Sequence, residues 1–169
     1  THRYLNDARR HSDIYTANFK ERMLFLPEDV REQFLEWMKV EHELNEAELS
    51  QEFFMGEHEV QDLARRGGVV GSHAEHHRAF DSEDPEKIAE DVRRARERLE
   101  KLLGSTATSF SYPHGRVGKA SAGTFAILSA HGFTHAVTTL KREVRVDDHP
   151  FMIPRYNTND IRDFLRTAR

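Results

Sequence analysis

Three histidines follow a short apolar run near the middle of the chain, in the stretch GGVVGSHAEHHRAF, residues 67–80. His73 and His77 stand four residues apart, a spacing that places two side chains on one face of a helix. Neutral imidazoles are common ligands of zinc and similar divalent metals. The pair therefore indicates a metal site, with His76 as the competing ligand. For the pair alone, an exposed polar loop without a metal is the simpler interpretation.

The residues around the pair predict how it would be held. Ser72 and Glu75 match the S-x-x-E capping box, in which the serine side chain caps the first turn of a helix. We therefore expect a short helical turn directly after Ser72. His73 would lie in its first turn, and His77 would follow on the same face.

A second stretch with chemical potential is SFSYPHGR, residues 109–116. Proline lacks a backbone N–H and glycine permits close backbone approach, so a strand ending in Tyr112-Pro113-His114-Gly115 predicts a turn whose remaining N–H groups face a ligand. An ordinary strand-to-helix turn is the alternative.

Helices and short apolar runs alternate from residue 53 onward. The periodicity predicts helices at 57–68, 84–104 and 122–132, and strands at 69–71, 108–112 and 134–140. The helix at 84–104 has the clearest signals: Asp84 can cap it, Pro85 suits its first position and Gly104 can end it. Alternating strands and helices predict a parallel sheet or barrel, with its site at the carboxyl ends of the strands.

Residues 1–50 differ from the rest, because they are polar and helical in pattern. Pro27 can open a helix there, in which Val30, Phe34, Trp37 and Met38 recur at spacings of three and four. We interpret this part as a helical excursion. A length of 169 residues predicts a single domain.

Composition excludes several classes of function. Hydrophobic residues make up 37% of the chain, charged residues 32%, and the net charge is −4, with both signs interleaved, which argues against nucleic-acid binding. No run approaches the ~18 apolar residues of a membrane span, and no targeting segment is recognised, so we expect a soluble protein of unknown compartment. Cysteine is absent, so a metal would be bound by His, Asp, Glu or water.

Taken in order, with one long amphipathic helix between them, the two stretches resemble the polysaccharide deacetylases of carbohydrate esterase family four. The resemblance covers roughly residues 53–157. The histidine stretch resembles the G-S-H-x-x-x-H motif, and SFSYPHGR resembles the Tyr/Pro-rich third motif. The segments AHGFTHAVTT and DDHPFMIPRYNTND resemble the following strand and a Pro-Arg segment. The implied fold is α/β, a distorted incomplete (β/α) barrel over residues 51–169 with the N-terminal helical excursion.

The resemblance implies a metal-dependent hydrolase that removes N-acetyl groups from a carbohydrate or polysaccharide substrate. His73 and His77 match the metal ligands, with zinc the expected metal. His114 matches a position whose backbone N–H stabilises the oxyanion. Four more residues match or flank substrate-binding positions: Tyr112, Pro113, Gly115 and Arg155. A surface salt bridge is the alternative role for Arg155.

The sequence also departs from the family. Its first motif, an Asp-Asp pair upstream of the histidines that supplies the third metal ligand and the base, is not found, and neither is its late histidine motif. Asp81 and Asp84 follow the histidines, so we interpret them as loop and capping residues. We expect that an N-terminal piece with the first strand is missing. Two alternatives stay open: an inactive deacetylase-like domain that binds glycan or a protein, and a histidine-rich metal-binding or structural protein.

Overall fold

The computed structural model describes residues 18–19, 22–23, 26–80, 84–115 and 121–156. The chain forms two compact units, Thr1–Phe54 and Met55–Arg169. Their boundary lies close to the division at residues 50 and 51 expected from the sequence. That both units form a single domain stays a prediction.

The first unit is helical where it is described, as its polar periodic pattern predicts. Helix α2 spans Glu28–Glu41, directly after Pro27, and α3 spans Glu46–Phe53. The Asn45 side chain caps α3 by accepting hydrogen bonds from the first backbone N–H groups of the helix. No predicted site residue lies in this unit.

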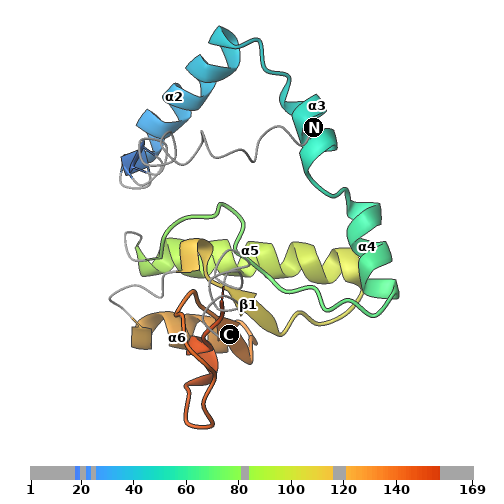
Figure 1. Ribbon diagram of the computed structural model, residues 1–169, viewed down its shortest axis with the longest axis vertical. Coiled ribbons are helices and arrows are strands. Elements are labelled where there is room, and N and C mark those ends of the chain that lie inside the picture. Colours follow the sequence, from blue (N-terminus) through green and yellow to red (C-terminus); the bar gives the residue numbers. More distant parts are fainter. Residues whose placement is uncertain (1–17, 20–21, 24–25, 81–83, 116–120, 157–169) are drawn as a thin grey trace, which may run out of the picture. The chain divides into compact units, whose positions relative to one another are not determined.

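The second unit contains a small parallel sheet and three helices among its described residues (Figure 1). Its regular elements, in chain order, are α4 (Glu57–Arg65), α5 (Pro85–Leu103), β1 (Ser109–Ser111), η2 (Pro113–Gly115), α6 (Ser121–Ala130), β2 (His135–Val137) and η3 (Pro150–Met152). The three helices and the last two strands predicted in this unit are thereby confirmed, with shorter strands than expected. The described part of the whole chain is mostly helical.

Strands β1 and β2 pair in parallel, with Ser109 opposite His135 and Ser111 opposite Val137. Single parallel bridges extend the sheet on both sides, from Ser72 to Phe110 and from Val137 to Ile153. The strand predicted at 69–71 is therefore wrong in its bounds. Only the next residue, Ser72, pairs with β1, and Val69 is 90% exposed.

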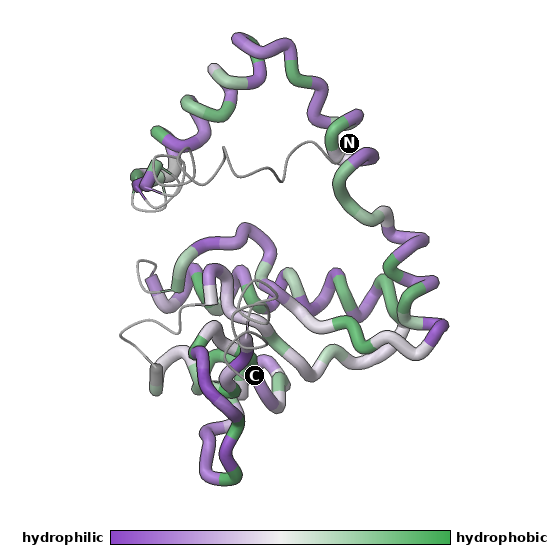
Figure 2. Tube along the Cα trace, viewed as in Figure 1, coloured by the Kyte–Doolittle hydropathy of each residue, from purple (hydrophilic) through white to green (hydrophobic). Residues whose placement is uncertain are grey.

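Helix α5 follows its sequence signals closely. The Asp84 carboxylate accepts a hydrogen bond from Glu86 N–H at 2.8 Å, Pro85 is the first helical residue, and Gly104 ends the helix in a left-handed conformation. Apolar and hydrophilic positions alternate along its length (Figure 2), which leaves one face to pack inward. The buried residues of that face include Ile88, Val92 and Ala95.

The core of the second unit lies between α5, the sheet and α6. It joins the α5 face to seven further side chains, namely Phe80, Phe110, Tyr112, Leu128, Phe133, Ala136 and Phe151. Phe110 makes edge-to-face ring contacts with Tyr112 and Phe133 at centroid distances of 5.5 and 5.3 Å. This aromatic packing fixes the strands that lead to the candidate site.

Candidate active site

The parallel strands end on the predicted site residues. Ser72 is paired with β1 and leads into His73, β1 leads into the turn from Tyr112 to Gly115, and β2 leads into Thr138 and Thr139. These segments are joined across the sheet, because Thr139 N–H donates to the Gly115 carbonyl at 3.3 Å. The structure thus brings together the two motifs that the sequence analysis singled out.

The segment after Ser72 is not the helical turn predicted from the capping box. Ser72 is an extended residue whose N–H donates to Ser109 and whose carbonyl accepts from Ser111 N–H. Its hydroxyl is buried and has no hydrogen-bond partner in the described part of the chain, so it caps nothing. The loop instead contains two residues in left-handed conformations, Ala74 at φ 64° and His77 at φ 53°.

Although the helix is absent, the imidazoles meet. The rings of His73 and His77 lie 4.8 Å apart between centroids, and the His114 ring lies 4.4 Å from that of His77. His114 Nε2–H also donates to the His77 carbonyl at 3.2 Å. A cluster of three imidazoles, which we call the histidine cluster (His73, His77 and His114), therefore forms at the strand ends.

Hydrogen bonding and burial prepare two of these rings for a metal. His73 Nδ1 lies 2.6 Å from the Ser111 carbonyl oxygen, which can only accept, so in the neutral ring Nδ1 carries the proton and Nε2 has the lone pair. Partial burial lowers the pKa of His77, and the neighbouring His114 and His73 lower it further. The lowered pKa favours the neutral form of His77, which is the form that a metal ion requires.

The donor set present fits part of a metal site. His73 and His77 supply two nitrogen ligands of the kind that zinc accepts. Within the described ranges, however, no group of three His, Asp or Glu side chains has a geometry that could hold a metal ion. The expected third ligand and the base are therefore not assigned to any described residue.

His76 does not compete with His77 for the cluster. Its backbone N–H and its ring Nδ1–H both donate to Oδ1 of Asp91, a buried residue of α5. Sequence reasoning missed Asp91. The signal was available, because an acidic residue lies next to Val92 on the apolar stripe of a helix and would be costly to bury without a partner.

The turn after β1 packs its first two side chains into the core. The Tyr112 and Pro113 side chains are fully buried, and Tyr112 Oη–H donates to the Phe151 carbonyl at 3.0 Å. Burial raises the pKa of Tyr112, so its hydroxyl stays neutral. These side chains support the turn from the core, and their contact with substrate stays a prediction.

Gly115 is buried and has a structural role. Its φ is 67°, and its N–H donates to the Tyr112 carbonyl at 2.9 Å. A Cβ at this position would lie 2.0 Å from Cγ2 of Thr139. The hydrogen bond to the Tyr112 carbonyl does not use the His114 N–H, whose expected role in binding an oxyanion stays a prediction.

Arg155 lies beside the end of β2. Its Nε–H donates to the Thr138 carbonyl at 2.9 Å, and its backbone N–H donates to the Leu140 carbonyl at 3.2 Å. The side chain is exposed and is held by a main-chain oxygen. These bonds fix Arg155 at the same edge of the sheet as the turn, and its contact with substrate stays a prediction.

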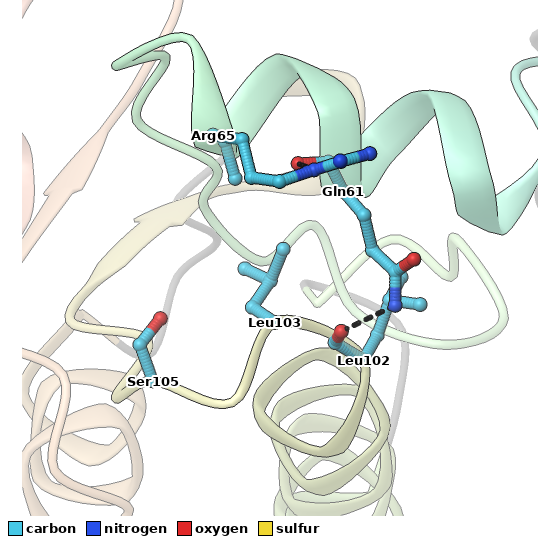
Figure 3. Close-up of a pocket in the computed structure, with 6 residues that line it drawn as sticks. Gln61, Arg65, Leu102, Leu103 and Ser105 are labelled. Atoms are coloured by element: carbon cyan, nitrogen blue, oxygen red, sulfur yellow. Dashed lines mark hydrogen bonds between the residues drawn. The ribbon is translucent and has the colours of Figure 1, made fainter.

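A hollow of about 390 Å³ lies away from the histidine cluster, between α4 and the end of α5 (Figure 3). Gln61 Nε2–H spans it and donates to the Leu102 carbonyl at 2.9 Å. Arg65, Leu103 and Ser105 also line it. None of the residues predicted to bind metal or substrate lies there.

The sequence matches the family model for polysaccharide deacetylase over residues 33–140. The chain belongs to the polysaccharide deacetylase family. The match includes both motifs and begins well before residue 53, where the resemblance seen in the motifs starts. Most of α2 and all of α3 therefore fall within the part that this chain shares with the family.

Solved structures give the same fold. The deacetylase PplD from Streptococcus pyogenes, in complex with acetate, is 16% identical with a TM-score of 0.59, covering 72% of this chain and 55% of its own. IcaB from Ammonifex degensii is 25% identical with a TM-score of 0.58, covering 68% and 52%. A de-N-acetylase from Aggregatibacter actinomycetemcomitans is 13% identical with a TM-score of 0.52, covering 66% and 53%.

These matches span about half the length of the solved relatives. No curated protein matches the sequence. Among the described residues, no helix has the length and apolar character needed to cross a membrane.

Proposed function

We propose that this polysaccharide deacetylase chain carries the histidine part of a metal-dependent site that removes N-acetyl groups from a carbohydrate. The observation that supports it most is the histidine cluster, formed where parallel strands end. Such strand ends are where β/α barrels place their active sites. The proposal includes the finer fold, an incomplete (β/α) barrel to which β1 and β2 contribute.

In this proposal His73 and His77 hold a divalent metal, with zinc the expected ion. When bound, such a metal polarises the acetyl carbonyl and lowers the pKa of a coordinated water. The Ser111 carbonyl keeps the proton of His73 on Nδ1, so that Nε2 is the ligating atom. Two carboxylates outside the described residues belong to this proposal, one as the third metal ligand and the other as the base.

The remaining residues act on the substrate. The His114 backbone N–H donates to the oxyanion that forms when water adds to the acetyl carbonyl, a stabilisation made in the transition state. His114 has φ 57°, and the buried turn below it holds this conformation. Arg155, fixed by the Thr138 carbonyl, binds the carbohydrate at the rim of the site.

A second candidate is an inactive deacetylase-like domain that binds glycan or a protein partner. It is favoured by one observation: the described residues include no three-ligand metal group. In that case the histidine cluster has only a packing or binding role.

Calorimetric titration of the chain with Zn²⁺ tests the metal site. We expect His73→Ala and His77→Ala each to weaken binding more than the ~10–100-fold typical of losing a group that supports a ligand. His131→Ala is the matched control, since His131 follows α6 and lies outside the histidine cluster. Unchanged affinity in both cluster variants would contradict the proposal.

Acetate release from an N-acetylglucosamine oligosaccharide, measured with Zn²⁺ present, separates the two candidates. Release that is lost in His73→Ala and His77→Ala supports the deacetylase. If the full-length protein binds zinc and the oligosaccharide but releases no acetate from the oligosaccharide, the result supports the inactive domain.

A further inference from the structure

Asp91 is a buried carboxylate on the inner face of α5, 4% exposed, beside Val92. Its Oδ1 accepts two hydrogen bonds, from His76 N–H at 3.1 Å and from His76 Nδ1–H. Its Oδ2 is buried without a hydrogen-bond partner in the described part of the chain. Burying a carboxylate is unfavourable unless hydrogen bonds compensate it, and both compensating bonds come from one residue.

That residue lies between the two candidate metal ligands. His76 directly precedes His77, and the backbone around it is not held by helical hydrogen bonds, since this segment forms no helix. Ala74 and His77, on either side of it, have left-handed φ values that non-glycine residues rarely adopt. The loop therefore needs an external anchor to keep one conformation.

Helix α5 is suited to provide this anchor. It is capped at both ends and packed through Ile88 and Val92, so Asp91 projects from a fixed element. In Figure 1 the segment that leads into α5 runs alongside that helix, and the hydrogen bonds of Asp91 join the two.

We propose that Asp91 is a positioning residue for the histidine pair. Asp91 holds His76 through both its backbone and its ring. It thereby fixes the direction in which the His77 side chain projects from the loop, and so the position of the His77 ring relative to that of His73. Asp91 touches neither ring of the pair and acts through His76. The inference deepens the proposed function, because it assumes that the pair binds a metal.

The loop has a second contact with α5 that serves as a control. Glu75 Oε1 lies 3.4 Å from Arg98 Nη1, and the Arg98 side chain is 70% exposed. Exposed ion pairs of this kind contribute little to stability. Glu75→Gln thus removes a contact between the same loop and the same helix without touching the buried anchor.

The test measures Zn²⁺ affinity of the full chain by calorimetry and the coordination of Co²⁺ by its visible absorption. We expect Asp91→Asn to weaken Zn²⁺ binding by about 10–100-fold, as loss of groups that orient metal ligands does. His76→Ala, at an exposed side chain, keeps the backbone hydrogen bond and should lose less. Glu75→Gln should stay within about twofold of the original chain.

Asp91→Glu should recover part of the lost affinity, because it keeps the carboxylate. Zn²⁺ affinity and Co²⁺ spectra that are unchanged in both Asp91→Asn and His76→Ala would overturn the proposal. An equal loss of Zn²⁺ affinity in Glu75→Gln would also overturn the proposal, since any disturbance of the loop would then be enough to weaken metal binding. Because the His76 side chain is exposed, His76→Ala tests the anchor even if Asp91→Asn fails to fold.

Imidazole NMR signals of the metal-free chain give a second measurement. We expect the signals of His73 and His77 to shift or broaden in Asp91→Asn and His76→Ala and to stay in place in Glu75→Gln. If the original chain binds no Zn²⁺, the proposed function fails, while these signals still show whether Asp91 positions the pair. Unmoved signals in both anchor variants would refute the positioning role.

Discussion

Replacing Gly115 by alanine tests the structural basis of the turn that follows β1. The backbone at Gly115 has φ 67°, and an added Cβ would lie 2.0 Å from Thr139 Cγ2 and 2.2 Å from Thr139 Oγ1. Normal carbon contacts are about 3.5–4.0 Å, so either the turn or the strand end must move. Gly104 is a matched control, since its φ is 64° and nothing lies within 4 Å of its added Cβ.

The two substitutions share the backbone penalty and differ in the steric one. A left-handed conformation costs an alanine roughly 1–2 kcal/mol, which is the whole effect expected for Gly104→Ala. Overpacking adds about 1–3 kcal/mol, so we expect Gly115→Ala to lower the free energy of unfolding by about 2–5 kcal/mol.

Urea denaturation followed by far-UV circular dichroism measures both variants against the original chain. The three atoms closest to the added Cβ belong to the Thr139 side chain, so Thr139→Gly should relieve the clash. In the Gly115→Ala background it should restore stability, although alone it removes the hydrogen bond from Thr139 Oγ1–H to the Gly115 carbonyl. If Gly115→Ala destabilised the protein no more than Gly104→Ala, the steric argument would be refuted.

Three further substitutions test the fold away from the cluster. Asp84→Ala removes the cap of α5 and should lower the free energy of unfolding, measured by urea denaturation, by about 1 kcal/mol. An unchanged free energy would contradict the stabilising role of the capping hydrogen bond. Leu128→Ala, at a fully buried side chain, should cost about 2–5 kcal/mol in the same assay, and a smaller loss would mean that its site is not well packed. Hydrogen bonds from Arg142 hold the pKa of Asp148 at about 2, below its ordinary value of 3.8, so this stabilisation is present above that value and is lost as the pH falls towards 2. The melting temperature of Asp148→Asn should therefore lie below that of the original chain at neutral pH and approach it between pH values of about 4 and 2. Glu143→Gln, the control, should not show this pH-dependent difference. A difference for Asp148→Asn that persists in acid would show that ionisation of Asp148 is not its source.

The helices of the second unit could be predicted because their signals are local. Asp84, Pro85 and Gly104 act on residues within one or two turns, so their effect can be read from neighbouring positions. The order of α5, β1, α6 and β2 followed from these elements. The bounds of the strands did not, because pairing depends on partners far away in the chain.

The residues of the histidine cluster could be singled out from the sequence, but the local structure predicted for them is wrong. Ser72 and Glu75 match a capping box, yet the backbone of Ser72 is paired with β1, and that long-range pairing prevails over the local signal. The rings of His73 and His77 still meet, through a loop rather than a helix. The Tyr112 side chain turned inward because the aromatic core lies on that side, which no short-range pattern specifies.

The hydrogen bond that orients His73 has an evolutionary consequence. Its acceptor is the main-chain carbonyl of Ser111, which any amino acid at position 111 would provide. Mutation of that residue therefore cannot delete the acceptor, as mutation of an orienting aspartate or glutamate would. We expect position 111 to tolerate drift among side chains that suit a strand, while the nitrogen that His73 presents stays the same.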